Sequence, residues 1–272
     1  MTESTLRVGF VYPELLGTYG DRGNAVVLVQ RARWRGHPAE LVEVPAGAPI
    51  PGGLDVYLFG GGEDDPMHLA GAGMRDSRAT IERAVAAGAV VLAVCGGFQL
   101  VGRRYLAADG TELDGIGLLD LETRAGATRL IGEVVVDPDP PLPRLTGFEN
   151  HWGRTTLGPD LAPLGRVVTG GGNGDGQRVE GALAGRVVGT YLHGPVLARN
   201  PALADQLIAD ALDVATLEPL DTALESRLRA ERLHATTGGH RARCRRGAVR
   251  RAGGSRVRCR AARASRRRAR QR

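Results

Sequence analysis

The chain has 272 residues, contains no lysine and carries a formal net charge of +6. That charge is unevenly distributed: residues 238–272 hold 15 arginines and no acid, whereas residues 1–237 carry 21 arginines against 30 acids, a net charge of −9. The acidic main part gives no reason to expect a nucleic-acid partner. No apolar run approaches the roughly 18 residues of a membrane span, and the three cysteines predict neither a disulfide framework nor a zinc site.

Strands and helices alternate over the first hundred residues. Apolar runs between turn residues predict strands at residues 6–12, 39–44, 56–59 and 89–94. Amphipathic stretches predict helices over residues 24–36 and 76–88, the second begun by Asp76 as its N-cap and ended by Gly88. This alternation is typical of the α/β class, with a mostly parallel sheet flanked by helices and ligands bound at the carboxyl ends of the strands.

Residues 89–102, AVVLAVCGGFQLVG, predict a buried strand, a sharp turn and a helix. Cys95 occupies the turn, with Ala93 and Gly97 two residues to either side. A nucleophile on such an elbow needs small neighbours, because the strained backbone passes close to itself and to the substrate. A lone cysteine after an apolar strand is also typical of an inert core residue. We interpret Cys95 as a nucleophile whose thiol pKa is lowered by the N-terminus of the following helix, with Gln99 bracing the elbow.

The second half changes to short strands and turns, which predict an antiparallel, irregular region. Strands are expected at residues 129–137 and 146–157. Residues 170–176, GGGNGDG, have neither a following helix nor the Lys of a phosphate-binding loop, so we expect a hairpin turn there. A last strand over residues 186–192 ends at His193, and a helix with one apolar face follows from Asn200.

Two histidines are candidate partners for Cys95. His193 ends an apolar strand and is followed by Gly and Pro, so it is expected at the carboxyl edge that also carries Cys95. His151 lies inside a polar stretch beside Trp152. A solitary His at a strand end is commonly structural, but the pairing with an elbow cysteine favours His193 as a general base.

These features together resemble the class I glutamine amidotransferases, in their cobyric-acid-synthase-like branch. The resemblance covers about residues 6–215 and includes a triple glycine after a strand, the cysteine elbow and the late strand that ends in His. It is carried by six stretches in the same order: YPELLGTYGDRGN (12–24), FGGGEDD (59–65), AVCGGFQLVG (93–102), RLIGE (129–133), GFENHWGRT (147–155) and YLHGPVLARNPALAD (191–205). Ala93 departs from the pattern, because many relatives have Gly there.

The resemblance implies a glutaminase. Cys95 would attack the side-chain amide of L-glutamine to form a thioester, with His193 as base and then as acid. Backbone amides of Gly96 and of the 60–62 turn, with Gly61 at its centre, would hold the oxyanion. Arg129 would bind the glutamine substrate, although one arginine among many is also typical of a solvated charge.

The resemblance also implies a Mur-ligase-like partner subunit. That subunit would bind ATP and Mg, so no cofactor is expected in this chain, and would use the ammonia to convert the D-glutamate of lipid II to D-isoglutamine in peptidoglycan synthesis. The complex is expected to be a cytoplasmic heterodimer, brought to the inner face of the membrane by lipid II. Most class I glutaminases have a Glu two residues after the catalytic His, where this chain has Pro195. The partner is therefore expected to supply the third catalytic acid, with Glu149 and Glu180 as alternatives within the chain.

Other functions remain open at this point: a glutaminase for another acceptor such as a corrinoid carboxylate, a different hydrolase or redox chaperone with a cysteine elbow, or a silent binding module.

We expect three segments: a glutaminase domain over residues 1–215, an extension over 216–237 and an Arg-rich disordered tail over 238–272. The tail's composition is typical either of a segment that binds nucleic acid or anionic membranes, or of translation in a shifted reading frame.

Overall fold

The computed structural model describes the backbone of residues 5–246 and the side chains of residues 5–236. The first of two sheets has six strands, in the order β11 (Ala182–Ala184), β12 (Val187–Thr190), β4 (Val90–Val94), β3 (Val56–Phe59), β1 (Leu6–Val11) and β2 (Ala39–Val44). Every neighbouring pair is parallel except β11 with β12. All residues of β3 and β4 are buried, as continuous apolar runs predict for strands covered on both faces.

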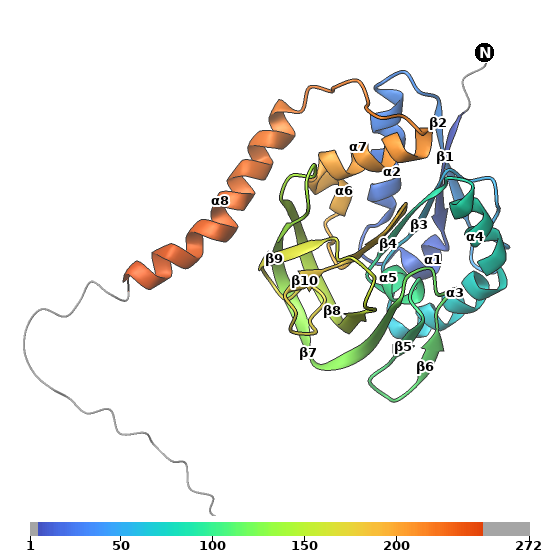
Figure 1. Cartoon of the computed structure of the whole chain (residues 1–272), viewed down its shortest axis with the longest axis horizontal. Helices are drawn as coiled ribbons and strands as arrows, with labels where there is room; N and C mark the ends of the chain where they lie inside the picture. Colours follow the sequence, from blue (N-terminus) through green and yellow to red (C-terminus); the bar gives the residue numbers. More distant parts are fainter. Residues whose placement is uncertain (1–4, 247–272) are drawn as a thin grey trace, which may run out of the picture.

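Helices cover both faces of this sheet (Figure 1). On one side lie α2 (Arg22–Arg33), α6 (Val196–Arg199) and α7 (Pro201–Leu212). On the other lie α3 (Asp64–Asp76) and α4 (Arg78–Ala86), with the short α1 (Pro13–Leu16) against α3. The α/β class, with a mostly parallel sheet flanked by helices, is therefore confirmed.

The region predicted as a single helix over residues 76–88 contains the end of one helix and the start of another. Asp76 is the last residue of α3 and not a cap of α4. The chain turns at Ser77, whose hydroxyl accepts a hydrogen bond from the backbone amide of Ile50 at 3.1 Å. Helix α3 was not predicted, although its buried residues recur at helical spacing, at Met67, Ala70, Gly71 and Met74.

The second sheet is mainly antiparallel, as predicted. Its strands are β10 (Val179–Glu180), β9 (Gly165–Thr169), β7 (Leu121–Asp137), β5 (Arg104–Leu106) and β6 (Glu112–Asp114), with β8 (Leu145–Leu157) also paired to β7. Strand β7 begins at Leu121, well before the predicted start at residue 129, whereas β8 matches its predicted bounds to within one residue. The two strands form a hairpin whose register shifts between Ala125 and Leu130. The glycine-rich stretch at residues 170–176 joins the antiparallel strands β9 and β10, so the predicted hairpin turn is confirmed.

A long helix, α8 (Ala223–Arg246), follows the two sheets and extends away from them (Figure 1). It is tied to β7 by an ion pair between Arg232 and Glu133 at 2.9 Å. The helix continues past the boundary expected between residues 237 and 238. The rest of the predicted disordered tail lies outside the described residues. Within the described part of the chain, no helix is long and apolar enough to cross a membrane.

Candidate functional site

Cys95 occupies the strained turn between β4 and α5 (Gly96–Leu100). Its φ of 52° and ψ of −105° lie in a region that residues with a side chain rarely adopt. A Cβ at Gly97 would lie 2.5 Å from the carbonyl oxygen of Phe59, so only glycine fits between the elbow and β3. The predicted strand, sharp turn and helix are therefore all present.

The environment of Cys95 favours a neutral thiol. The residue is 5% exposed, and desolvation raises its pKa to about 12, with the Asp21 carboxylate adding to the rise. A hydrogen bond from the Gly96 amide acts in the opposite direction but is the smaller effect. The expectation that the following helix lowers the thiol pKa is thus wrong for this chain by itself, because burial outweighs the N-terminus of a five-residue helix.

His193 lies at the same edge of the sheet as Cys95. Strand β12 is parallel to β4 with Thr190 opposite Val94, so Cys95 and His193 follow the ends of neighbouring strands. The backbone of His193 then pairs with Phe148 of β8, through hydrogen bonds of 2.8 and 3.0 Å in the two directions. The imidazole packs on the ring of Tyr19, with centroids 4.8 Å apart.

No hydrogen-bond partner for either ring nitrogen of His193 exists among the described residues. Burial lowers the pKa of this imidazole to about 4, so the free chain holds it neutral. The two in-chain candidates for a third acid are both engaged elsewhere. Glu149 accepts hydrogen bonds from the amides of Gly171 and Gly172, and Glu180 accepts them from Thr190 and Tyr191.

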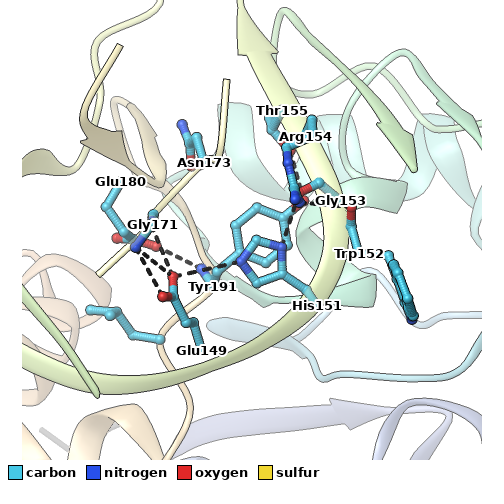
Figure 2. A network of polar contacts seen from close by, with 12 residues as sticks. Glu149, His151, Trp152, Gly153, Arg154, Thr155, Gly171, Asn173, Glu180 and Tyr191 are labelled. Atoms are coloured by element: carbon cyan, nitrogen blue, oxygen red, sulfur yellow. Dashed lines mark hydrogen bonds and ion pairs between the residues drawn. The ribbon is translucent and has the colours of Figure 1, made fainter. Parts of the chain in front are cut away.

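His151 belongs to a separate buried network (Figure 2). Its ring stacks on that of Tyr191, with the ring centroids 3.6 Å apart. Its Nδ1 lies 3.1 Å from the carbonyl oxygen of Gly153. Its Nε2 is 3.9 Å from the Glu149 carboxylate, and burial lowers its pKa to about 3. Gln99, on α5, donates to the Tyr191 hydroxyl at 3.2 Å and thereby links the elbow helix to this network.

Arg129 lies in β7 and reaches toward the first sheet. Its Nη2 donates to the hydroxyl of Tyr19 at 3.1 Å and is 3.8 Å from the carboxylate of Glu63. The Tyr19 hydroxyl in turn donates to Glu63 at 2.5 Å. Since the ring of Tyr19 also contacts the imidazole of His193, Tyr19 lies between Arg129 and His193. The Nε of Arg129 is buried without an acceptor among the described residues, so a carboxylate entering there would find an unused donor.

The triple-glycine turn packs against the elbow. A Cβ at Gly96 would lie 2.9 Å from the amide nitrogen of Gly62, so these two backbones are in close contact. The amide of Gly61 donates to the Asp21 carboxylate at 2.7 Å. Burial raises the pKa of that carboxyl to about 6, with the Gly61 bond opposing the rise. A substrate oxygen would therefore have to compete with Asp21 for the Gly61 amide.

Sequence reasoning missed the contributions of Tyr19, Asp21 and Glu63. Tyr19 and Asp21 lie between the first predicted strand and the first predicted helix, and Glu63 follows the triple glycine. Asp21 is 0% exposed. An acid in a glycine-rich loop directly after the first apolar strand was the available signal, because such a loop lies at the same carboxyl edge.

A pocket of about 410 Å³ opens beside His193. Its lining comes from the α1–α2 loop, strands β7 and β8, the segment from His193 to α6, and α8: Tyr19, Glu133, Phe148, Asn150, His193, Gly194, Arg199 and Arg232. Exposed apolar side chains lie on the same hairpin, with Ile131 62%, Trp152 45% and Phe148 36% exposed. In the part of the chain that the structure covers, no three His, Cys, Asp or Glu side chains gather as a metal site would require.

The fold is that of the glutamine amidotransferases. A crystal structure of a glutamine amidotransferase superposes with a TM-score of 0.52 at 18% identity, covering 76% of this chain and 100% of that one. The chain belongs to the CobB/CobQ-like glutamine amidotransferase domain family, whose pattern matches residues 7–201.

Curated relatives extend this assignment. The chain is 35% identical over 221 residues to the GatD subunit of the glutamine-hydrolysing lipid II isoglutaminyl synthase of Staphylococcus aureus, covering 80% of this chain and 90% of that subunit. The same subunit of Streptococcus pneumoniae is 35% identical over 209 residues, covering 76% and 80%. Cobyric acid synthase of Sphingopyxis alaskensis is 35% identical over 179 residues, but these amount to only 34% of that protein.

Proposed function

We propose that this chain is the glutaminase subunit of a lipid II isoglutaminyl synthase. The observation that carries the proposal is the match to two GatD subunits over 90% and 80% of their lengths. The cobyric acid synthases, which represent the alternative of a corrinoid acceptor, match over only about a third of theirs. The parallel strands β4 and β12, which bring Cys95 and His193 to one edge, support the chemistry that these relatives' names describe.

In the proposed reaction, Cys95 is the nucleophile and His193 the base. His193 takes the thiol proton as sulfur attacks the amide carbon of L-glutamine, and returns it to the departing nitrogen, which leaves as ammonia. Water then attacks the thioester, and glutamate leaves as the Cys95 thiol re-forms. Burial keeps both side chains neutral in the free chain, so the His193 imidazole is free to accept the thiol proton as sulfur attacks.

Arg129 is proposed to bind the substrate's α-carboxylate. Its guanidinium lies beside Tyr19 and has an unused donor, which supports that role. The proposed oxyanion site combines the Gly96 amide with one from the triple-glycine turn. Within that turn, Gly61 could serve only after releasing Asp21, whereas Gly62 is in direct contact with Gly96.

The missing carboxylate is proposed to come from a synthetase subunit of the Mur-ligase type. His193 lacks a carboxylate partner within the described residues, and the pocket beside it has room for a side chain from another protein. That subunit would bind ATP and Mg, activate the D-glutamate carboxylate of lipid II and receive the ammonia. The resulting heterodimer would work in the cytoplasm, at the membrane face where lipid II is held.

Ammonia release from glutamine tests the proposal, measured with and without the purified synthetase subunit. We expect a low rate for the chain alone and an increase of roughly 10²-fold or more in the complex, since an unoriented His loses much of its catalytic effect. Cys95→Ala should abolish release in the complex, whereas Cys244→Ser, a control at a cysteine remote in sequence, should not. A full rate in the isolated chain, unchanged by the partner, would contradict the shared site.

A further inference from the structure

The segment that carries His193 crosses from one sheet to the other. Its last residue in the parallel sheet is Thr190, opposite Val94 of β4. Three residues later, the backbone of His193 pairs with Phe148 of β8. Tyr191 and Leu192 lie between the two pairings and are fully buried, so their amides need hydrogen-bond acceptors that neither sheet provides.

Glu180 provides these acceptors, directly and through Thr190. Its Oε1 accepts a hydrogen bond from the amide of Tyr191 at 2.7 Å and one from the hydroxyl of Thr190 at 2.9 Å. That hydroxyl then accepts from the amide of Leu192 at 3.0 Å. Figure 2 shows the Glu180 carboxylate directed at Tyr191 from the end of β10. One buried carboxylate thus pairs, directly or through the Thr190 hydroxyl, with the backbone amides of the two residues before His193.

Thr190 also contacts Cys95. The carbonyl oxygen of Thr190 accepts a hydrogen bond from the backbone amide of Cys95 at 2.9 Å. Thr190 therefore contacts the elbow through its backbone and Glu180 through its side chain. A shift of Thr190 would move the thiol and the imidazole relative to each other.

We infer that Glu180 is a positioning residue. It holds His193 and the Cys95 elbow in the relative position that the glutaminase reaction needs. The expected loss of rate rests on the proposed function. The expected loss of order at Tyr191 and Leu192 does not depend on it. Glu180 contacts neither side chain and acts through Thr190 and Tyr191. A misplacement of about 1 Å from a residue outside the chemistry can cost roughly 10²-fold in rate.

Glutamine should replace Glu180 with little loss. Both hydrogen bonds fall on Oε1, and Oε2 has no partner among the described residues. Burial, with the nearby Glu149 carboxylate adding to it, raises the pKa of Glu180 to about 7, so the site tolerates an uncharged group. The amide oxygen of Gln would accept the same two donors, whereas Leu, of similar size, would accept neither and would leave the Tyr191 amide unpaired.

The test compares Glu180→Gln and Glu180→Leu in the complex with the synthetase subunit. We expect Glu180→Gln to keep kcat within about threefold of the wild type, and Glu180→Leu to lower kcat by about tenfold or more with KM nearly unchanged. Thr190→Val keeps the shape of the side chain and removes the hydroxyl, and should lower kcat in the same way. It serves as the second variant if Glu180→Leu does not fold.

Glu149→Leu is the matched control, because Glu149 is also buried and also accepts backbone amides, but those of Gly171 and Gly172. It should lose comparable stability with a much smaller loss of kcat. Equal losses of kcat in Glu180→Leu and Glu149→Leu, or none in Glu180→Leu, would overturn the inference. An equal loss in Glu180→Gln and Glu180→Leu would also overturn it.

Hydrogen exchange separates this inference from the proposed function. The amides of Tyr191 and Leu192 should exchange faster in Glu180→Leu and Thr190→Val than in the wild type or Glu180→Gln, whatever the substrate is. If the wild-type complex releases no ammonia, the proposed function fails, and exchange alone then decides whether Glu180 holds the segment. Unchanged exchange at both amides in Glu180→Leu would refute the positioning role.

Discussion

Raising the pH in the presence of iodoacetamide should expose the suppressed reactivity of Cys95. With Cys244 and Cys259 replaced by Ser, Cys95 is the one thiol left in the chain. Its pKa is raised from 9.0 to about 12, which corresponds to a thiolate fraction at pH 7.5 of about 1 in 30,000. At a pKa of 9.0 the fraction would be about 1 in 30. Burial, with the Asp21 carboxylate adding to it, thus lowers the reactive thiolate fraction roughly a thousandfold.

The dependence of alkylation on pH is the useful measurement, because it is independent of how easily the reagent reaches the thiol. Mass spectrometry of the peptide that contains Cys95 should show a rate that rises about tenfold per pH unit from pH 7 to pH 10, without a plateau. A plateau at or below pH 8 in the isolated chain would refute the claim that burial outweighs the elbow helix.

Addition of the synthetase subunit should change this profile. A carboxylate placed against His193 would raise the pKa of its imidazole, by roughly 1 to 3 units for a close pair, and favour proton transfer from Cys95. The alkylation rate at pH 7.5 should then rise by about tenfold or more, provided the reagent still enters the site. In His193→Ala the partner should have no such effect, and a partner effect that persists in this variant would show that His193 is not the group affected.

Three further predictions concern single residues. Arg129→Ala should raise the KM for glutamine about tenfold or more in the complex and spare the fold, whereas Arg124→Ala, at an exposed position of the same strand, should change KM little. Gly97→Ala should lower the free energy of unfolding by about 1 to 3 kcal/mol, because its Cβ would meet the backbone of β3; denaturant unfolding would measure this, and no change would contradict the close contact. His151→Phe keeps the stacked ring but cannot bind a proton. Since the folded-state pKa of His151 is lowered from 6.5 to about 3, the unfolded chain binds more protons below pH 6.5, and the wild type should lose up to about 3 kcal/mol relative to this variant between pH 7.5 and pH 4.

Much of the site's position follows from short-range sequence signals. The charge-free run before Cys95 and the run before His193 predict buried strands, and the glycines after each predict turns at one edge of a sheet. These signals are local, because burial on both faces demands continuous apolar residues and a turn with positive φ demands small neighbours. The ends of β4 and β12 could therefore be predicted without knowing their partners.

The remainder depends on contacts between distant segments. Asp21 meets Gly61 across 40 residues, and Arg129 meets Tyr19 across 110. No periodicity in either segment indicates its partner. The thiol pKa failed as a prediction for the same reason, because the apolar packing and the Asp21 carboxylate that raise it come from other elements.

The sheet order also has a consequence for folding. Strands β4 and β12 are neighbours in space, yet the whole second sheet lies between them in sequence. Two parallel strands joined by so long a connection pair slowly. The entropy lost in bringing the ends of the connection together must be overcome before the contact between the strands contributes to stability. A ribosome-bound chain that has released only β1 to β4 therefore carries the cysteine without its histidine. We expect the ability to hydrolyse glutamine to emerge only after the second sheet has formed, so that incomplete chains release no ammonia.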